Sequence, residues 1–167
     1  MRKKMPRLAL LSTVLGGLLT MGLVAPVQAV GNVQISGPAE IDEAGCDAPP
    51  MGFDDFPGLA LHGSLEGCLY THVGTSSVTP SGTYKESGHE TIVASLNGGP
   101  MGTFTTNYKF EAKFDLATMA ELKGRCQHPI VEGSGTGGFE GATGRLDFKD
   151  LIGDPTTYVY RGHIKLG

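Results

Sequence analysis

Polar and apolar residues alternate along most of the second half of the chain with a period of two, which is typical of half-buried β-strands. The clearest example is 104–116, where aromatic and aliphatic residues stand on one face and mostly polar residues on the other. The same alternation over 59–73 predicts one long strand, and over 158–166 it predicts a last strand that runs to the C-terminus. Strands of this length suit the wall of a barrel better than an edge ribbon.

Less regular or shorter strand patterns fill the intervals at 83–96, 121–131 and 145–150. Turn signals such as Pro80-Ser81-Gly82 separate them, and the chain after residue 30 has no convincing helical period. Seven or so strands at hairpin spacing predict an antiparallel barrel or sandwich. A last strand that pairs with the first would remove two exposed edges, so we predict an all-β fold, a closed antiparallel β-barrel.

The first 29 residues predict an export signal. Four basic residues precede an apolar stretch over 8–24, and Val27-Gln28-Ala29 places small or modest side chains where a signal peptidase cleaves. The alternative is a retained membrane anchor, but this stretch is short for a bilayer span and its glycines weaken a helix. We expect cleavage after Ala29, with 1–29 as the signal peptide and the product secreted.

Residues 30–58 show no sustained pattern. Val33-Gln34-Ile35 predicts at most a short strand, and four prolines among scattered acids and glycines argue against a regular element after it. We expect 30–58 to be an extended lead-in that wraps one β-barrel domain formed by 59–167.

Removal of the signal changes the charge of the protein. The whole chain has a net charge of −4, but the signal holds four of the 13 Lys and Arg and none of the 17 Asp and Glu. The exported part therefore has nine cations against 17 anions, a net charge of −8. An acidic surface predicts no nucleic-acid partner and, after signal cleavage, no membrane partner.

All three cysteines lie in the exported part, where an oxidising compartment favours one disulfide and leaves one thiol over. Cys68 and Cys126 both fall in strand-like segments, and neighbouring strands can bring Cα atoms to about 5.5 Å. We favour this pair. Cys46 falls in a loop-like stretch and is either free or the partner of one of the other two.

Two further patterns predict no cofactor and no metal. Residues 133–138 contain G-x-G-x-x-G, but the following residues cannot open the helix that a dinucleotide site requires, so the glycines predict a tightly packed loop at the barrel rim. Among the five histidines, only His128 has a cysteine close by, Cys126, and no second pair completes a tetrahedral zinc site.

Polar residues on the predicted walls are the candidates for a cavity: Glu66, Tyr70, Tyr108, Arg125 and His128. A glutamate buried beside a tyrosine or histidine has a raised pKa and can act as a general acid or base. The alternative, favoured for Glu66 and Tyr70, is that the polar face of 59–73 is its solvent face.

A family resemblance lies in the C-terminal part of the chain. Gly135-Thr-Gly-Gly-Phe-Glu-Gly-Ala-Thr-Gly144, with Leu146-Asp-Phe148 and Tyr160-Arg-Gly-His-Ile-Lys-Leu166 after it, resembles the C-terminal signature of bacterial proteins with an allene oxide cyclase-like barrel. The run is also similar to the G-G-x-G-x-F-x-G-A-x-G stretch of plant dirigent proteins, which share that barrel. The resemblance is most specific over 128–167 and says little about 30–58.

The resemblance implies an eight-stranded antiparallel barrel with a central cavity for a small hydrophobic molecule, often in homotrimers. The plant enzymes steer cyclisation or radical coupling of a bound substrate, but the matching residues here belong to the scaffold and carry over no catalytic role. The first expectation is therefore a secreted binder of a small hydrophobic ligand. The alternatives are an isomerase or cyclase acting on a reactive lipid-like or polyketide-like intermediate, and a structural surface protein that oligomerises.

Overall fold

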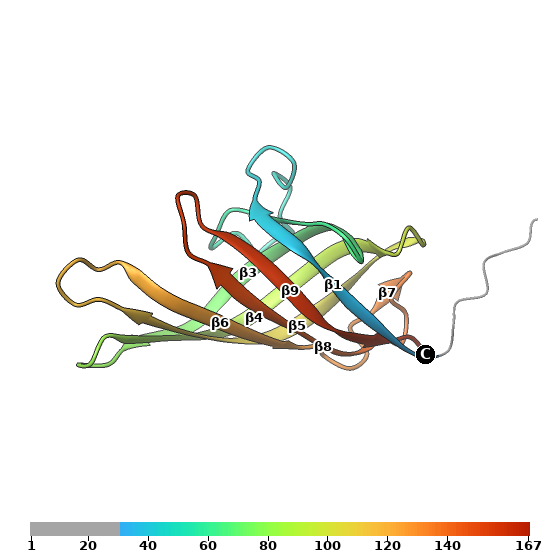
Figure 1. Ribbon diagram of the computed structural model, residues 1–167. Helices are drawn as coiled ribbons and strands as arrows, with labels where there is room; N and C mark the ends of the chain where they lie inside the picture. The colour runs from blue at the N-terminus through green and yellow to red at the C-terminus, as the bar shows by residue number, and fades with distance from the viewer. Residues whose placement is uncertain (1–30) are drawn as a thin grey trace, which may run out of the picture.

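The structure is a computed structural model that describes residues 31–167, and its regular elements are all β-strands (Figure 1). The predicted export signal lies outside the described residues. In 31–167 we find no helix with the length and apolar character needed to cross a bilayer. The strands are β1 (Asn32–Ile41), β2 (Leu59–Leu61), β3 (Leu65–Val78), β4 (Thr83–Leu96), β5 (Met101–Phe114), β6 (Glu121–Pro129), β7 (Thr136–Gly137), β8 (Thr143–Leu151) and β9 (Thr157–Lys165).

Eight of these strands close into an antiparallel barrel. Following the hydrogen-bonded neighbours from β1 gives β2, β3, β4, β5, β6, β8 and β9, and β9 pairs with β1 again. The short β7 pairs with the start of β5 and stands outside this ring. The prediction of a closed antiparallel barrel is thus confirmed. Each strand pair in the ring except β1–β9 joins ring strands that follow one another in the chain, with the short β7 between β6 and β8.

The strand in 30–58 is longer than the short one predicted at Val33-Gln34-Ile35, so the expectation of no regular element after Ile35 was wrong as far as Ile41. β1 runs beside β9 from Asn32, which faces Lys165, to Ala39, which faces Tyr158. Ile35 and Ala39 point into the barrel and are almost fully buried. The alternation is hard to see in the sequence because the inward position between them is Gly37. Residues 42–58 form a long connection without a strand, as the prolines predict.

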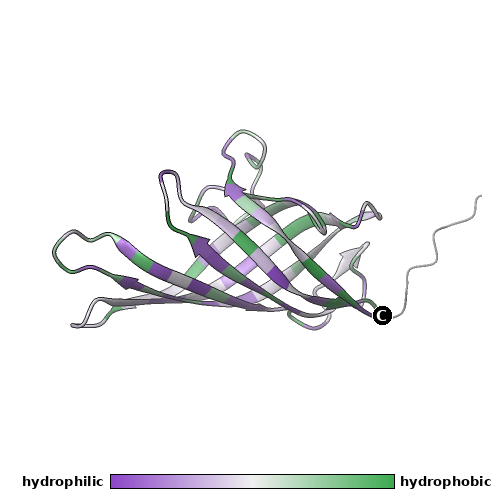
Figure 2. Ribbon diagram, in the orientation of Figure 1, coloured by the Kyte–Doolittle hydropathy of each residue, from purple (hydrophilic) through white to green (hydrophobic). Residues whose placement is uncertain are grey.

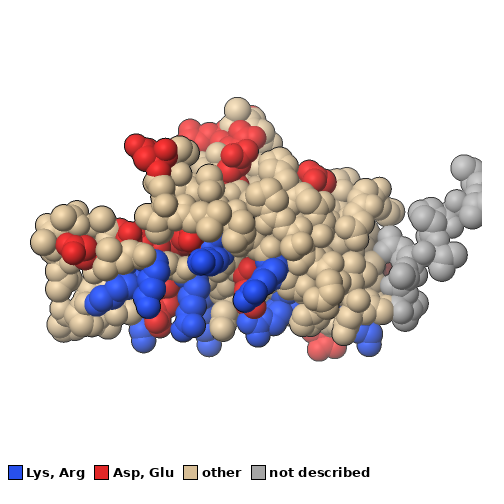
Figure 3. Space-filling view, in the orientation of Figure 1, with Lys and Arg blue, Asp and Glu red and all other residues tan. Residues whose placement is uncertain are grey.

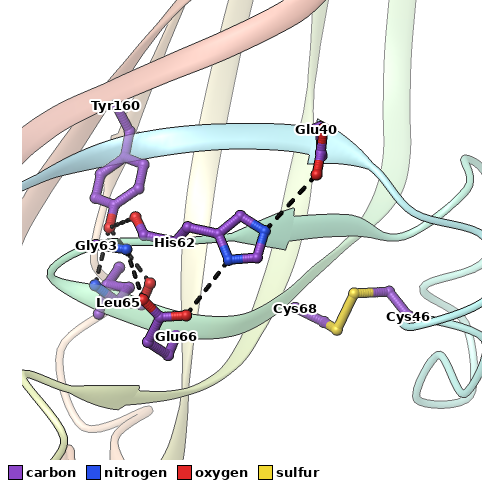
Figure 4. A network of polar contacts seen from close by, with 8 residues as sticks. All are labelled: Glu40, Cys46, His62, Gly63, Leu65, Glu66, Cys68 and Tyr160. Atoms are coloured by element: carbon purple, nitrogen blue, oxygen red, sulfur yellow. Dashed lines mark hydrogen bonds and ion pairs between the residues drawn. A yellow bond between two sulfur atoms is a disulfide. The ribbon is translucent and has the colours of Figure 1, made fainter.

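The predicted single strand over 59–73 was also wrong, because the chain reverses at 62–64 and forms the β2–β3 hairpin. Gly63 has a φ of 96°, a conformation that glycine adopts without strain. Leu61 and Leu65 flank the turn and both point inward, which is why a period of two persists through the reversal. The Tyr160 hydroxyl accepts the Leu65 N–H at 2.8 Å and donates to the His62 carbonyl at 2.9 Å, and so ties β9 to this turn (Figure 4).

One end of the barrel is filled by apolar side chains. Figure 2 shows hydrophobic and hydrophilic residues alternating along the strands, as expected for a wall with an apolar inner face. Phe139, from the glycine-rich run, lies against Phe104 with ring centroids 4.7 Å apart, and both are fully buried. Gly135 leaves no room for a Cβ against the Phe139 carbonyl. The run therefore forms a tightly packed loop at the barrel end, as its glycines predict. We call this the closed end of the barrel; it also contains Leu65, Ile92, Leu146 and Ile164.

The disulfide joins Cys46 and Cys68, with Cα atoms 5.7 Å apart, and Cys126 is free. The favoured Cys68–Cys126 pair was wrong because Cys68 is on the outer face of β3, whereas Cys126 points into the barrel from β6. The bridge fastens the 42–58 connection to the outside of β3, where Tyr70 and Ala60 pack beneath it. Closing a loop of this length contributes roughly 3 kcal/mol in the chain-entropy account.

Candidate functional site

The half of the barrel away from Phe139 holds ionisable side chains, and it is the candidate functional site. Each of them points inward from its strand, on the same face as the apolar residues nearer the closed end. The groups are Tyr84, Glu86 and Glu90 on β4, Tyr108 on β5, Glu121, Cys126 and His128 on β6, Asp150 on β8 and Tyr158 on β9.

Glu90 and His128 form the deepest polar pair of this site. The Glu90 carboxylate contacts His128 Nδ1 and also accepts the Thr106 hydroxyl at 2.9 Å. The two ionisable side chains are only 6% and 4% exposed. His128 Nε2 is buried and has no hydrogen-bond partner. A carboxylate on one ring nitrogen fixes the orientation of an imidazole, and the other nitrogen is left to exchange a proton with a bound molecule.

Aromatic rings hold the His128 imidazole from two sides. Tyr108 stacks on it with a centroid distance of 6.1 Å and an interplanar angle of 25°. Phe148 lies on β8 with its ring centroid 4.7 Å from that of His128. The unpartnered nitrogen therefore belongs to a ring that packing holds in place.

Glu86 accepts hydrogen bonds from two tyrosines one layer nearer the open end. The Tyr108 hydroxyl donates to Glu86 Oε1 at 2.8 Å, and the Tyr84 hydroxyl donates to Oε2. Burial, and then the hydrogen bond to Glu86, raise the pKa of Tyr108, and the same two causes raise the pKa of Tyr84. Both phenols thus remain protonated donors at neutral pH and hold the carboxylate in position.

Glu121 and Asp150 lie close together where β6 begins and β8 ends, away from Phe139. Burial, and then the neighbouring Asp150 carboxyl group, raise the pKa of Glu121 to about 7. Gly124 provides the space, because a Cβ at this position would collide with an oxygen of each carboxyl group. Glu121 Oε1 is a second buried polar atom with no hydrogen-bond partner.

The free Cys126 thiol lies between these layers. Burial raises its pKa, and the nearby Glu90 carboxylate adds to the effect. A protonated, buried thiol is a poor nucleophile, so Cys126 contributes a small apolar surface to the site.

The structure separates the five predicted cavity residues. Tyr108 and His128 face the interior, where they stack on each other. Tyr70 is buried, but on the outside of the wall beneath the 42–58 connection. Arg125 points outward from β6 and is exposed, so its prediction as a cavity residue was wrong.

Glu66 is also exposed, at the β2–β3 turn, and its prediction as a cavity residue was wrong (Figure 4). Its carboxylate accepts the Gly63 N–H at 2.7 Å and lies 3.4 Å from His62 Nδ1. The Gly63 hydrogen bond, assisted by His62, lowers the pKa of Glu66. Glu66 therefore stabilises the turn, in agreement with the solvent-face alternative.

Sequence reasoning missed the carboxylates of the interior. Glu86 and Glu90 lie at the same parity as Ile92 and Ala94 on 83–96. Two acids in register with the apolar face of a strand were the signal that could have found them. Glu121 and Asp150 are harder to find because they lie at or near strand ends, where the alternation does not predict whether a side chain points inward or outward.

Within residues 31–167 no three His, Cys, Asp or Glu side chains are grouped as a metal site would require. Comparison of the chain with models of known protein families, with curated proteins and with solved structures found no match. The resemblance to allene oxide cyclase-like and dirigent proteins therefore stays a prediction, and the function has to be argued from the site.

Proposed function

We propose that this chain is an exported protein that binds a small molecule with an apolar body and one polar group in the open half of its barrel. The observation that carries the proposal is the buried, unpartnered Nε2 of His128, set between aromatic rings above an apolar floor. An eight-stranded barrel is either filled by its own side chains or wide enough to hold one small ligand, and here only the Phe139 end is filled by apolar side chains.

Leaving a buried polar atom without a partner costs about 1–3 kcal/mol. A ligand hydroxyl, carbonyl or carboxyl group that meets His128 Nε2 removes this cost. The apolar part of the ligand then packs on Phe148 and on the half-buried Phe110, whose ring lies on the same inner face. Export is supported by the Cys46–Cys68 disulfide, since such bonds persist in oxidising compartments.

Native mass spectrometry of the protein purified from the culture medium of its own host tests the proposal. We expect a retained small molecule on the wild-type protein, and its loss from a His128→Leu variant. His163→Leu is the matched control, because His163 lies on the outer side of β9. The same spectrum tests the proposed homotrimer. A bare wild-type trimer would contradict the binding proposal and favour the structural, oligomerising alternative.

The Glu90–His128 pair favours a second candidate function, an isomerase or cyclase. A bound molecule can give a proton to, or take one from, Nε2 while Glu90 stabilises the imidazolium. An intramolecular cyclisation needs mainly positioning, so one such pair in a shaped site is sufficient chemistry.

The Glu90→Gln variant separates the two candidates. An isomerase lacking its carboxylate accumulates substrate, so we expect a bound compound of the same mass as the wild-type ligand but of different chromatographic retention. If both proteins retain the same compound in similar amounts, the protein is a binder and the isomerase candidate is wrong.

A further inference from the structure

The cations of the described chain are gathered on one wall of the barrel. All nine Lys and Arg of residues 31–167 lie on β4, β5, β6, β8 and β9. Figure 3 shows Lys and Arg side chains over the lower half of the face in view, with some acidic side chains among them. Seven of the acids lie between 40 and 66, on β1, the following connection and the β2–β3 turn. The expectation that anionic surfaces repel this protein assumes that its net charge of −8 is evenly spread. In the fold, many of the acidic side chains lie apart from the basic ones.

The cations nearest the open end form two rows across the wall. Lys113 faces Lys123 directly between β5 and β6, and Arg125 faces Lys149 directly between β6 and β8. Lys85 stands in the same row as Arg125, with Glu111 between them. We call Lys85, Lys113, Lys123, Arg125 and Lys149 the basic collar.

The basic collar destabilises the fold by its own charge. Like charges directly opposite each other on neighbouring strands repel. Within the described range, the one Lys or Arg that pairs with a carboxylate is Arg145, which lies outside the collar. Lys113 instead donates to the Ser81 carbonyl.

Glu111 offsets part of this repulsion, because it faces both Lys85 and Arg125. Nothing in residues 31–167 offsets it between Lys113 and Lys123. An anionic partner would offset it there.

Large apolar side chains are exposed next to the basic collar. They stand where the β3–β4, β5–β6 and β8–β9 connections project from the open end (Figure 1). We call them the apolar rim: Val78, Leu116, Met119, Leu122, Leu151 and Ile152, each between 41% and 64% exposed. Leu122 adjoins Lys123 in the chain, and Leu151 lies two residues after Lys149.

We propose that the apolar rim and the basic collar dock the open end of the barrel on an anionic lipid bilayer. Apolar side chains enter the boundary between headgroups and acyl chains, and the cations behind them meet the negative surface. The rim also carries Asp115 and Asp154, and the Asp115 carboxylate accepts the Ala117 and Thr118 N–H groups at 2.9 Å each. The acidic 42–58 connection leaves the barrel at the same end, but between β1 and β2, across the ring from β5 and β6. The β5–β6 side of this end therefore faces the bilayer, and the β1–β2 side is turned away from it. The inference goes beyond ligand binding and does not depend on it.

Sedimentation with lipid vesicles tests the inference, with the exported protein and vesicles of phosphatidylcholine alone or with about 30% phosphatidylglycerol. We expect binding to the anionic vesicles, none to the neutral ones, and a steep loss of binding between about 0.05 M and about 0.5 M salt. Lys113→Gln with Lys123→Gln should weaken binding about 25-fold, at about fivefold for each cation near the surface. Arg145→Gln with Lys165→Gln, the same charge change on β8 and β9 near the closed end, should weaken it much less.

Leu116→Ser with Leu122→Ser tests the rim and should weaken vesicle binding about tenfold or more. Met51→Ser is the control, because Met51 is 99% exposed in the acidic 42–58 connection. Unchanged binding of the Leu116/Leu122 variant would overturn the inference, as would equal binding to neutral vesicles. Alternatively, the rim could join copies of this chain. In that case the wild-type protein would be an oligomer in the absence of vesicles and the Leu116/Leu122 variant would be a monomer, a result that would also overturn the inference.

Discussion

At the scale of single residues, the interior carboxyl groups make the folded state depend on pH. The pKa of Glu121 rises from about 4.5 to about 7 in the barrel, so between these values the native state keeps a proton that the unfolded chain has lost. The contribution of Glu121 to the free energy of unfolding is therefore complete below about pH 4.5 and falls as the pH rises to about 7. Above that pH, two carboxylates face each other beside Gly124.

We expect Glu121→Gln to remove much of the fall in thermal stability between about pH 5 and about pH 8, since the amide stays neutral and can still donate to Asp150. Thermal unfolding followed by circular dichroism at both pH values measures the effect. Glu132→Gln, at an exposed loop position, is the control. An identical loss of stability in Glu121→Gln and wild-type protein would show that Glu121 titrates normally.

At the scale of elements, Tyr160 links β9 to the β2–β3 turn across the intervening strand β1. Its side chain extends from β9 across β1 to the β2–β3 turn, where its hydroxyl meets the Leu65 N–H and the His62 carbonyl. It passes over β1 at Gly37, where a Cβ would collide with that carbonyl and would lie 2.8 Å from the hydroxyl. The tie thus requires both the tyrosine and the glycine.

Tyr160→Phe should lower the free energy of unfolding by about 1–3 kcal/mol, because it leaves a buried N–H group unpaired. Urea unfolding measures the change. Tyr158→Phe is the control on the same strand, since the Tyr158 hydroxyl makes no hydrogen bond among those found in 31–167. Equal stability losses in the two variants would contradict a specific role for the Tyr160 hydroxyl.

The sequence predicts an element where its alternation is long and unbroken, as on β5, whose inward aromatics were all placed on the correct face. It fails at β1, because Gly37 interrupts the apolar face, and at 59–73, because a tight reversal preserves the period. The site was only half predictable for a related reason. Tyr108 and His128 lie within clear strands, whereas Glu86 and Glu90 are charged residues on an inner face, where burial is ordinarily costly.

At the scale of the whole molecule, stability and proposed function occupy opposite ends of the barrel. The closed end is packed with Phe104, Phe139 and their aliphatic neighbours. The open end holds ionisable groups, unpartnered polar atoms and half-buried aromatics such as Phe110. Polar atoms without partners destabilise a fold, so the closed end must supply the compensating packing energy.

This division predicts a contrast between two phenylalanines of β5 that face the same interior. Phe104→Ala should cost about 3–5 kcal/mol of the free energy of unfolding, because its ring is fully buried. Phe110→Ala should cost clearly less, because Phe110 is only half-buried. Urea unfolding of both variants tests this, and equal costs would show that the open end is packed as tightly as the closed end.

The pairing of β1 with β9 also sets the order in which the protein can fold. Seven of the ring's contacts join consecutive strands, and each can form soon after its second strand is available. The eighth joins the first strand to the last, so it must wait until nearly the whole chain has been delivered. A chain that threads through a membrane N-terminus first therefore remains an open, incomplete sheet during its passage and becomes a ring only on the far side.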